Sequence, residues 1–176
     1  MNNICAILLD LGDTIMIEES EVKDNTLTTL KADLVIGMDY VIRKLSGDGI
    51  KLGLVADTKP GTYKNVLIHH RLYNLFDIFA ISEELGVEKP NPEIFTFALN
   101  KLGIQPIDYG RVLMVGNNLH RDIRGANNLG LTSVWFHWND RYRTIPVDDS
   151  EIPKYIVHSV DELLNLISTI NIQNSG

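Results

Sequence analysis

The chain has 176 residues, 44% hydrophobic and 22% charged, which is enough for one domain with a sizeable core and too few for two. The formal net charge of −7 excludes a broadly basic face and disfavours nucleic acid or an anionic membrane as a partner. No apolar run approaches the about 20 residues that span a bilayer, and a single cysteine, Cys5, cannot form an internal disulfide, so we expect a cytoplasmic protein.

Short apolar runs alternate with helical segments along the chain. The runs are apolar at consecutive positions, which is typical of strands buried on both faces of a parallel sheet. The predicted strands cover residues 3–10, 50–56, 78–82, 111–116, 132–136 and 155–159. The predicted helices cover residues 39–49, 61–73, 92–102, 121–130 and 160–168. This alternation predicts an α/β fold, a three-layer α/β/α Rossmann-like sandwich with a mostly parallel central sheet.

Polar residues follow several of these strands at the point where each strand ends. They are Asp10 after the first strand, Asp57 and Thr58 after the second, Asn117 after the fourth with Asp122 beyond it, and Lys89 before the helix at 92. Ligands of open α/β sheets bind beyond the carboxyl ends of the strands, so we expect these side chains to share one pocket. Each residue taken alone has a structural explanation as a turn, cap or surface residue. Their combination favours a functional site.

The chemistry that this set supports is phosphoryl transfer. A carboxylate held at a strand tip, Asp10, can attack phosphorus and form an acyl phosphate. Lys89 can act as a fixed positive charge for the phosphoryl oxygens. Mg²⁺ prefers one or two carboxylates together with water and substrate phosphate, and Asp10 with Asp122 could provide them.

Four stretches of the chain resemble, in order, the motifs of the haloacid dehalogenase superfamily. They are LLDLGDTI, LGLVADT, VEKPNPEIF and VLMVGNNLHRDIRGANNLG, and the match runs over residues 4–136. Members of this superfamily are mostly Mg²⁺-dependent phosphatases with an aspartate nucleophile. The resemblance implies the phosphatase-like branch of that fold, with Asp10 as nucleophile, Lys89 as the cation and Thr14 as the threonine of the first motif.

The resemblance also implies the remaining site residues. The substrate or phosphate-binding positions are Gly12, Thr14, Ala56, Asp57 and Thr58. The Mg²⁺-binding positions are Asp10, Gly12, Asn117 and Asp122.

Three positions depart from the pattern of the superfamily. Gly12 stands where a second aspartate protonates the leaving group and then activates water, and the loss of a general acid and base commonly costs ~10²–10⁴ in rate. Ala56 stands in place of a Ser or Thr that binds phosphate, and Asn117 in place of an acid. Asp13 and Asp57 are the candidates to replace the missing acid, so Asp13 joins Asp10 and Lys89 as a predicted catalytic residue.

Superfamily members with large caps insert them after the first or the second motif, and this chain has little room for one. Residues 15–38 are weakly periodic and acidic at first, and we expect a residual cap or flap there. Residues 1–170 are predicted to form a single catalytic domain, with a frayed tail at 171–176. Little or no cap implies an open site for a small phosphorylated substrate or a phosphoprotein.

These observations favour a Mg²⁺-dependent phosphatase-like hydrolase that acts on phosphate monoesters, or on acyl or aryl phosphates, through an aspartyl-phosphate on Asp10. Leaving groups that need little protonation would suit a site with Gly12. The alternative is a catalytically impaired module that binds phosphate or a protein. A third reading is a 2-haloacid dehalogenase, although dehalogenases of the superfamily rely on a substantial cap.

Overall fold

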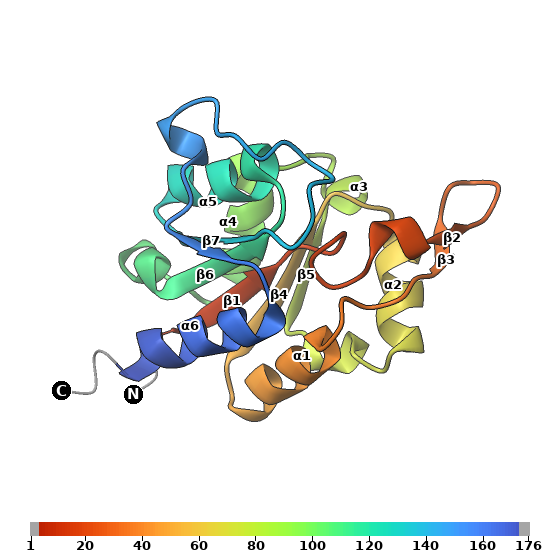
Figure 1. Cartoon of the computed structure of the whole chain (residues 1–176), viewed down its shortest axis with the longest axis horizontal. Helices are drawn as coiled ribbons and strands as arrows, with labels where there is room; N and C mark the ends of the chain where they lie inside the picture. Colours follow the sequence, from red (N-terminus) through yellow and green to blue (C-terminus); the bar gives the residue numbers. More distant parts are fainter. Residues whose placement is uncertain (1–3, 173–176) are drawn as a thin grey trace.

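A computed structural model of the chain describes residues 4–172, and within them a six-stranded parallel sheet forms the centre of the molecule (Figure 1). The strand order is β5-β4-β1-β6-β7-β8. The strands are β1 (Ala6–Leu9), β4 (Lys51–Ala56), β5 (Ile78–Ile81), β6 (Val112–Gly116), β7 (Thr132–Phe136) and β8 (Tyr155–Val157). Every residue of β1, β6 and β7 is buried, as the consecutive apolar positions predict.

Helices cover both faces of this sheet (Figure 1). On one face lie α1 (Met38–Gly47), α2 (Pro60–His69) and α6 (Val160–Ile172), and on the other α4 (Pro92–Lys101) and α5 (Arg124–Leu129). The first core joins Val41, Leu67 and Leu163 to the sheet, and the second joins Phe95 and Ala126 to its opposite face. The three-layer α/β/α prediction is therefore confirmed. Within residues 4–172, none of the helices combines the length and apolar character that a bilayer crossing needs.

Short segments connect these elements. They are α3 (Ser82–Leu85), the 3-10 turns at Glu18–Ser20, Tyr73–Leu75, Pro106–Arg111 and Asp149–Glu151, and a π-helical turn at Leu119–Ile123. The helix predicted at 61–73 ends early, because Arg71 adopts a left-handed conformation (φ 57°). The helix predicted at 121–130 instead begins as the π-turn, continues as α5 and ends at Gly130, which is left-handed (φ 74°). The closing helix α6 extends to Ile172, and residues 173–176 of the predicted tail lie outside the described residues.

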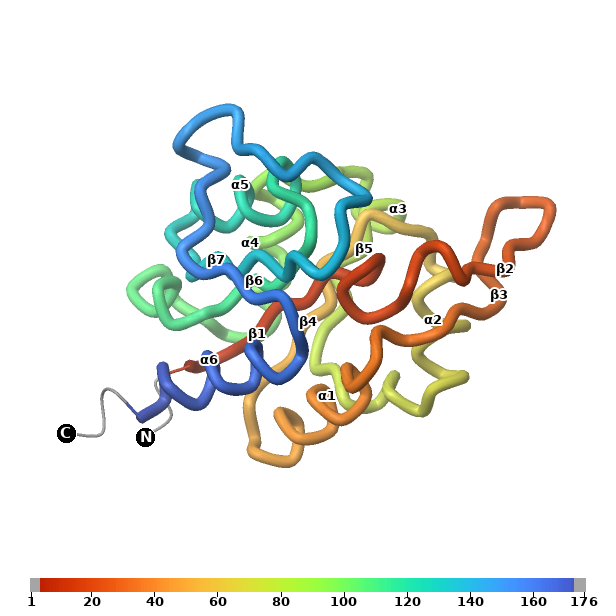
Figure 2. Tube along the Cα trace, in the orientation of Figure 1, coloured from red at the N-terminus to blue at the C-terminus, as the bar shows by residue number. Residues whose placement is uncertain are grey.

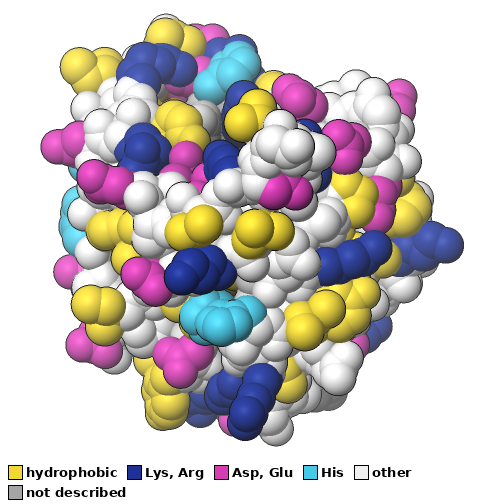
Figure 3. Space-filling view, turned by 90° about the vertical axis from the view of Figure 1, so that its right-hand side faces the viewer, with side chains coloured by type: hydrophobic (Ala, Val, Ile, Leu, Met, Phe, Trp, Pro, Cys, Tyr) yellow, Lys and Arg dark blue, Asp and Glu magenta, His cyan; other side chains and the backbone are white. Residues whose placement is uncertain are grey.

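The segment predicted as a residual cap or flap, residues 15–38, folds as a small hairpin rather than a domain. Strands β2 (Val22–Lys23) and β3 (Thr29–Lys31) pair in antiparallel fashion and lie against α2 (Figure 1). The backbone N–H of Thr29 donates to Thr62 Oγ1 (3.0 Å), and Asn65 Nδ2 donates to the Thr29 carbonyl (2.9 Å). The described chain therefore has no large cap domain. Figure 3 faces this side of the molecule, where acidic and basic side chains alternate without a continuous patch of either sign.

The long polar loop after β7, residues 137–153, returns across the carboxyl edge of the sheet. Figure 2 shows it beside the loop that follows β1. Trp138 Nε1 donates to the Asp13 carbonyl (2.7 Å), and the Tyr142 hydroxyl donates to the Glu18 carboxylate (2.8 Å). The two loops are thus joined by side-chain hydrogen bonds near the end of β1.

Glu151 anchors the far end of this loop. Its carboxylate is buried and lies 2.8 Å from Arg143 Nη2 and 3.1 Å from Arg124 Nη2, and it accepts the Val147 N–H at 3.0 Å. Burial acts to raise the pKa of Glu151, but hydrogen bonds from Arg143, Val147 and His120 outweigh it and hold the pKa below its ordinary value.

Replacing Glu151 by Ala is expected to lower the free energy of unfolding by about 1–3 kcal/mol, because the charged groups around it lose their acceptor. Since the pKa of Glu151 is lower in the folded chain, its contribution is present above the unfolded pKa of about 4.3 and is lost as the pH falls through the folded value. Urea unfolding of wild type and variant, at neutral and at acid pH, measures both effects. Equal stability at neutral pH would contradict the anchoring role, and Asp140→Ala, at an exposed loop position, is the control.

Candidate functional site

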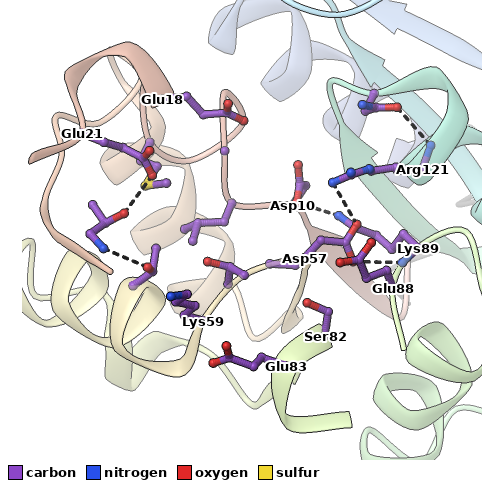
Figure 4. A pocket seen from close by; sticks show the side chains of 18 of the residues that line it. Asp10, Glu18, Glu21, Asp57, Lys59, Ser82, Glu83, Glu88, Lys89 and Arg121 are labelled. Atoms are coloured by element: carbon purple, nitrogen blue, oxygen red, sulfur yellow. Dashed lines mark hydrogen bonds and ion pairs between the residues drawn. The ribbon is translucent and has the colours of Figure 1, made fainter. Parts of the chain in front are cut away.

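A pocket of about 720 Å³ opens at the carboxyl edge of the sheet, where the sequence places the site (Figure 4). Seven of the residues predicted from the sequence line it: Asp10, Gly12, Ala56, Asp57, Thr58, Lys89 and Asn117. Three others, Asp13, Thr14 and Asp122, are buried beside it and do not form its wall. Strands β1, β4 and β6 bring the lining residues together, because their ends meet at one edge of the parallel sheet.

Lys89 joins two carboxylates at the base of the pocket. Its ammonium lies 2.6 Å from Asp10 Oδ1 and 2.7 Å from Asp122 Oδ1, and it also donates to the Val55 carbonyl at 2.9 Å. The side chains of Lys89 and Asp122 are 2% and 0% exposed, whereas that of Asp10 is 14% exposed. Asp10 is thus the most exposed member of this cluster.

The charges of this cluster depend on one another. Burial alone would lower the pKa of Lys89, but the Asp10 and Asp122 carboxylates raise it above its ordinary value, so the ammonium stays protonated. Burial and the charge of Asp10 raise the pKa of Asp122, and Lys89 opposes this rise. Gly116 allows the close approach of Asp122, since a Cβ at position 116 would lie 2.3 Å from the Asp122 carboxyl carbon.

Asp57 holds the backbone that carries Lys89. Its Oδ1 accepts the Lys89 N–H at 2.9 Å, and its Oδ2 lies 3.4 Å from Arg121 Nη1. Burial raises the pKa of Asp57, and the charges of Lys89 and Arg121 oppose that rise. Ala56 beside it has no side-chain hydroxyl to donate, whereas Thr58 lies in the pocket wall. Asp57 thus holds the Lys89 backbone through Oδ1, whereas its buried Oδ2 has no hydrogen-bond partner within the described residues.

Asp13 lies outside the pocket wall and organises the loop after β1. It is fully buried in a left-handed conformation (φ 44°), which Asp tolerates better than most residues. Its carboxylate accepts the Glu18 N–H (2.9 Å) and the Arg141 Nε–H. The predicted catalytic role of Asp13 stays a prediction, and the contacts show a residue that fixes the positions of Glu18 and Arg141. Thr14 is buried beside it, and its hydroxyl has no hydrogen-bond partner within the described residues.

The pocket wall also contains residues that the sequence reasoning does not assign to the site, among them Glu18, Arg121 and Tyr142. The Glu18 carboxylate lies directly over Gly12, since a Cβ at position 12 would be 2.2 Å from Glu18 Oε1. Burial and the charges of Asp13 and Asp10 raise the pKa of Glu18, against the opposing effect of Tyr142 and Arg141. The signal for these contacts is the poor fit of residues 15–38 and 137–153 to the β-α alternation, but sequence gives no sign that the two segments meet.

The donor atoms near Asp10 fit a hard cation such as Mg²⁺. Carboxylate and amide oxygens are its preferred protein ligands, and Asn117 Oδ1 is buried with no hydrogen-bond partner in the described part of the chain. Asp122 lies next to Asp10 across Lys89. Among the described residues, no cluster of three or more His, Cys, Asp and Glu side chains has metal-binding geometry. A Mg²⁺ site here would therefore rest on two carboxylates and neutral oxygens, with Asn117 among them.

The sequence of this chain is similar to those of known hydrolases. Residues 9–136 match the family described as "Haloacid dehalogenase-like hydrolase". A glyceraldehyde 3-phosphate phosphatase of Methanopyrus kandleri is 35% identical over 119 residues, 68% of this chain and 50% of that protein. The pyrimidine 5'-nucleotidase YjjG of Escherichia coli is 38% identical over 117 residues, 66% of this chain and 49% of that protein. The chain thus spans about half the length of these relatives.

A solved structure agrees in fold along nearly the whole chain. The crystal structure of a HAD phosphatase from Thermococcus onnurineus aligns with a TM-score of 0.77. It covers 96% of this chain and 100% of that protein at 18% sequence identity, which establishes the fold alone. The family match over residues 9–136 shows that the chain belongs to the haloacid dehalogenase-like hydrolase family.

Proposed function

We propose that the protein is a Mg²⁺-dependent phosphatase in which Asp10 receives the phosphoryl group of a small phosphate ester and then passes it to water. The observation that carries this proposal is the Lys89 ammonium, buried and in contact with both Asp10 and Asp122 at the base of the pocket. The two relatives named above are a glyceraldehyde 3-phosphate phosphatase and a pyrimidine 5'-nucleotidase, which supports a small phosphate ester as substrate. The lone Cys5 is compatible with the cytoplasm as its compartment.

The reaction uses the chain's own residues in two steps. In the first, Asp10 attacks phosphorus, the bond from phosphorus to the leaving oxygen breaks, and an aspartyl-phosphate forms. In the second, water attacks phosphorus and the acyl phosphate bond breaks, which releases phosphate and restores the Asp10 carboxylate. Lys89 orients Asp10 through their contact and supplies fixed positive charge beside the phosphoryl oxygens.

The charge of the pocket supports a role for the metal ion. Acidic side chains outnumber basic ones in its wall, with Asp10, Glu18, Glu21, Asp57, Glu83 and Glu88 against Lys23, Lys59, Lys89 and Arg121. A phosphate ester dianion would therefore meet net repulsion. Mg²⁺, when bound, would supply the positive charge that offsets this repulsion and neutralises the phosphoryl oxygens.

Removal of divalent cations is expected to abolish turnover of para-nitrophenyl phosphate, and added Mg²⁺ is expected to restore it. The measurement is the steady-state rate of para-nitrophenol release after EDTA treatment, followed by a Mg²⁺ titration. A triose phosphate and a pyrimidine nucleotide extend the assay to the substrates named for the relatives. Full activity in excess chelator would contradict the metal requirement.

The alternative is a module that binds phosphate and hydrolyses no phosphate ester. It is favoured by Gly12 and Ala56, which lack the acid and the hydroxyl expected at these positions from the resemblance. A phosphate mimic such as tungstate would then bind while no phosphate ester is hydrolysed. The third reading, a 2-haloacid dehalogenase, predicts halide release from a 2-haloacid. We expect no halide release, because the described residues form no large cap.

A further inference from the structure

Glu18 presents a carboxylate to the pocket next to Asp10, and no assigned step of the reaction uses it. Glu18 belongs to the 3-10 turn at Glu18–Ser20 and lines the pocket. Figure 4 shows its side chain projecting from that loop toward the side of the pocket on which Asp10 lies. Its side chain is 27% exposed, which leaves it accessible to a ligand. The carboxylate therefore lies where a bound ester could meet it.

Glu18 is held in this position from two sides. The Tyr142 hydroxyl lies 2.8 Å from Oε1 and 3.0 Å from Oε2, and the Glu18 N–H donates to the Asp13 carboxylate. Burial and the Glu18 carboxylate raise the pKa of Tyr142, so its hydroxyl remains a donor. The nearest guanidinium nitrogen, Arg141 Nε, is 4.0 Å from Oε2. Within the described residues, Glu18 thus accepts hydrogen bonds from a neutral hydroxyl, with no cation in direct hydrogen-bond contact.

Two other carboxylates of the pocket wall, Asp57 and Glu21, are held by neighbouring groups. Asp57 is 5% exposed, faces Arg121 and accepts the Lys89 N–H. Glu21 pairs with Lys23 and accepts the Thr29 hydroxyl. Glu18 differs from both because its side chain is more exposed, at 27%, and its ion-pair partner Arg141 Nε lies 4.0 Å away, beyond hydrogen-bond distance. A carboxyl group in that setting can carry a proton to a ligand and take one back.

The space above Gly12 accommodates the Glu18 carboxylate. A Cβ on Gly12 would lie 2.2 Å from Glu18 Oε1 and 2.9 Å from its carboxyl carbon, which is closer than atoms can pack. A side chain at position 12 and the Glu18 carboxylate in its present place therefore exclude one another. The carboxylate of Glu18 occupies the volume next to the nucleophile that a side chain two residues after Asp10 would fill.

Building on the proposed phosphatase reaction, we propose that Glu18 is its general acid and base, a catalytic residue supplied from six positions beyond Gly12. In the first step the Glu18 carboxyl proton goes to the leaving oxygen as its bond to phosphorus breaks and the Asp10–phosphorus bond forms. In the second step the Glu18 carboxylate takes a proton from the water that attacks phosphorus, as the Asp10–phosphorus bond breaks. The proton count is then restored, and the products are alcohol and phosphate.

Glu18→Gln is the test variant, because the amide keeps the size of the side chain and an acceptor for Tyr142 while it removes the transferable proton. The probes are para-nitrophenyl phosphate, whose leaving group needs little protonation, and phenyl phosphate and glycerol 3-phosphate, whose leaving groups need more. We expect kcat to fall by about 10²-fold or more for the last two and by less than about 10-fold for the first. The ratio of kcat values between esters is measured in one preparation. A misfolded fraction lowers every kcat equally and therefore does not change this ratio.

Two matched variants complete the experiment. Glu19→Gln changes the exposed neighbouring carboxylate, and Glu21→Gln changes another carboxylate of the pocket wall. Each of these two variants is expected to change kcat for all three esters by the same factor. If Glu18→Gln also changes kcat for all three esters by the same factor, or leaves kcat unchanged, the assignment of Glu18 is overturned. The proposed phosphatase function would still stand. Absence of turnover in the wild type would instead overturn the proposed function, and this inference with it.

Discussion

Asp10→Asn is expected to lower kcat for para-nitrophenyl phosphate by at least about 10⁴-fold, because an amide oxygen is a far weaker nucleophile than a carboxylate. The substitution is nearly isosteric, and Oδ1 can still accept the hydrogen bond from Lys89, which in the wild type measures 2.6 Å. The fold and the cluster at the base of the pocket should therefore survive. The loss would fall on chemistry rather than on stability.

Acid quenching gives a direct view of the same step. Wild type that is quenched during turnover should carry one phosphoryl group on the peptide that contains Asp10, as seen by intact and peptide mass spectrometry, and Asp10→Asn should carry none. Asp39→Asn, at an exposed position of α1 outside the pocket wall, is the control and should behave as wild type. Equal turnover in Asp10→Asn and wild type would rule out an aspartyl-phosphate on this residue.

Lys89→Met is expected to lower kcat by at least about 10³-fold. It is also expected to lower the free energy of unfolding by about 3–5 kcal/mol. Methionine matches the length of the lysine stem but leaves the Asp10 and Asp122 carboxylates without their shared cation. Asp122 is fully buried, so its uncompensated charge becomes costly. Urea unfolding and steady-state kinetics measure the two effects separately.

Second-site changes separate the structural part of this effect from the chemical part. Adding Asp122→Asn to Lys89→Met removes the unpaired buried charge, so stability should partly recover while activity stays absent. Lys64→Met, at a surface lysine that pairs with Glu84 at 3.9 Å, should change stability by less than about 0.5 kcal/mol. Wild-type stability in Lys89→Met would show that the buried cluster does not need its cation.

The assignment of Glu18 bears on the substrate range. With Gly12 alone in view, the sequence favours acyl or aryl phosphates, whose leaving groups depart without much help. A proton donor over Gly12 extends the expected range to alkyl esters such as sugar and triose phosphates. The glyceraldehyde 3-phosphate phosphatase among the relatives is named for a substrate of this kind. The leaving-group dependence of the Glu18→Gln variant therefore tests both the residue and the substrate class.

The loop after β7 takes part in the site through side chains rather than as a lid. Arg141 contacts the Asp13 carboxylate and Tyr142 the Glu18 carboxylate, so the loop fixes the two acids that follow β1. Glu151 in turn fixes the loop through Arg143 and Val147. Loss of the Glu151 contacts would thus disturb the position of Glu18 as well as lower the stability of the fold.

The sequence by itself determined the layered fold and the residues at the ends of the strands. Consecutive apolar positions require strands buried on both faces, and parallel strands bring their carboxyl ends to one edge, so Asp10, Asp57 and Asn117 had to meet there. Those constraints act within single elements and their immediate connections. They can therefore be read without knowledge of the distant chain.

Only the tertiary structure decided which acids reach the pocket. Tyr142 and Glu18 lie 124 positions apart, and Arg141 and Asp13 lie 128 apart, and no local pattern encodes contacts between two irregular loops. Sequence proximity favours Asp13 as the partner of Asp10, but its left-handed backbone and the Arg141 contact hold it in the buried loop. Glu18 takes the space over Gly12 because that residue has no side chain to exclude it.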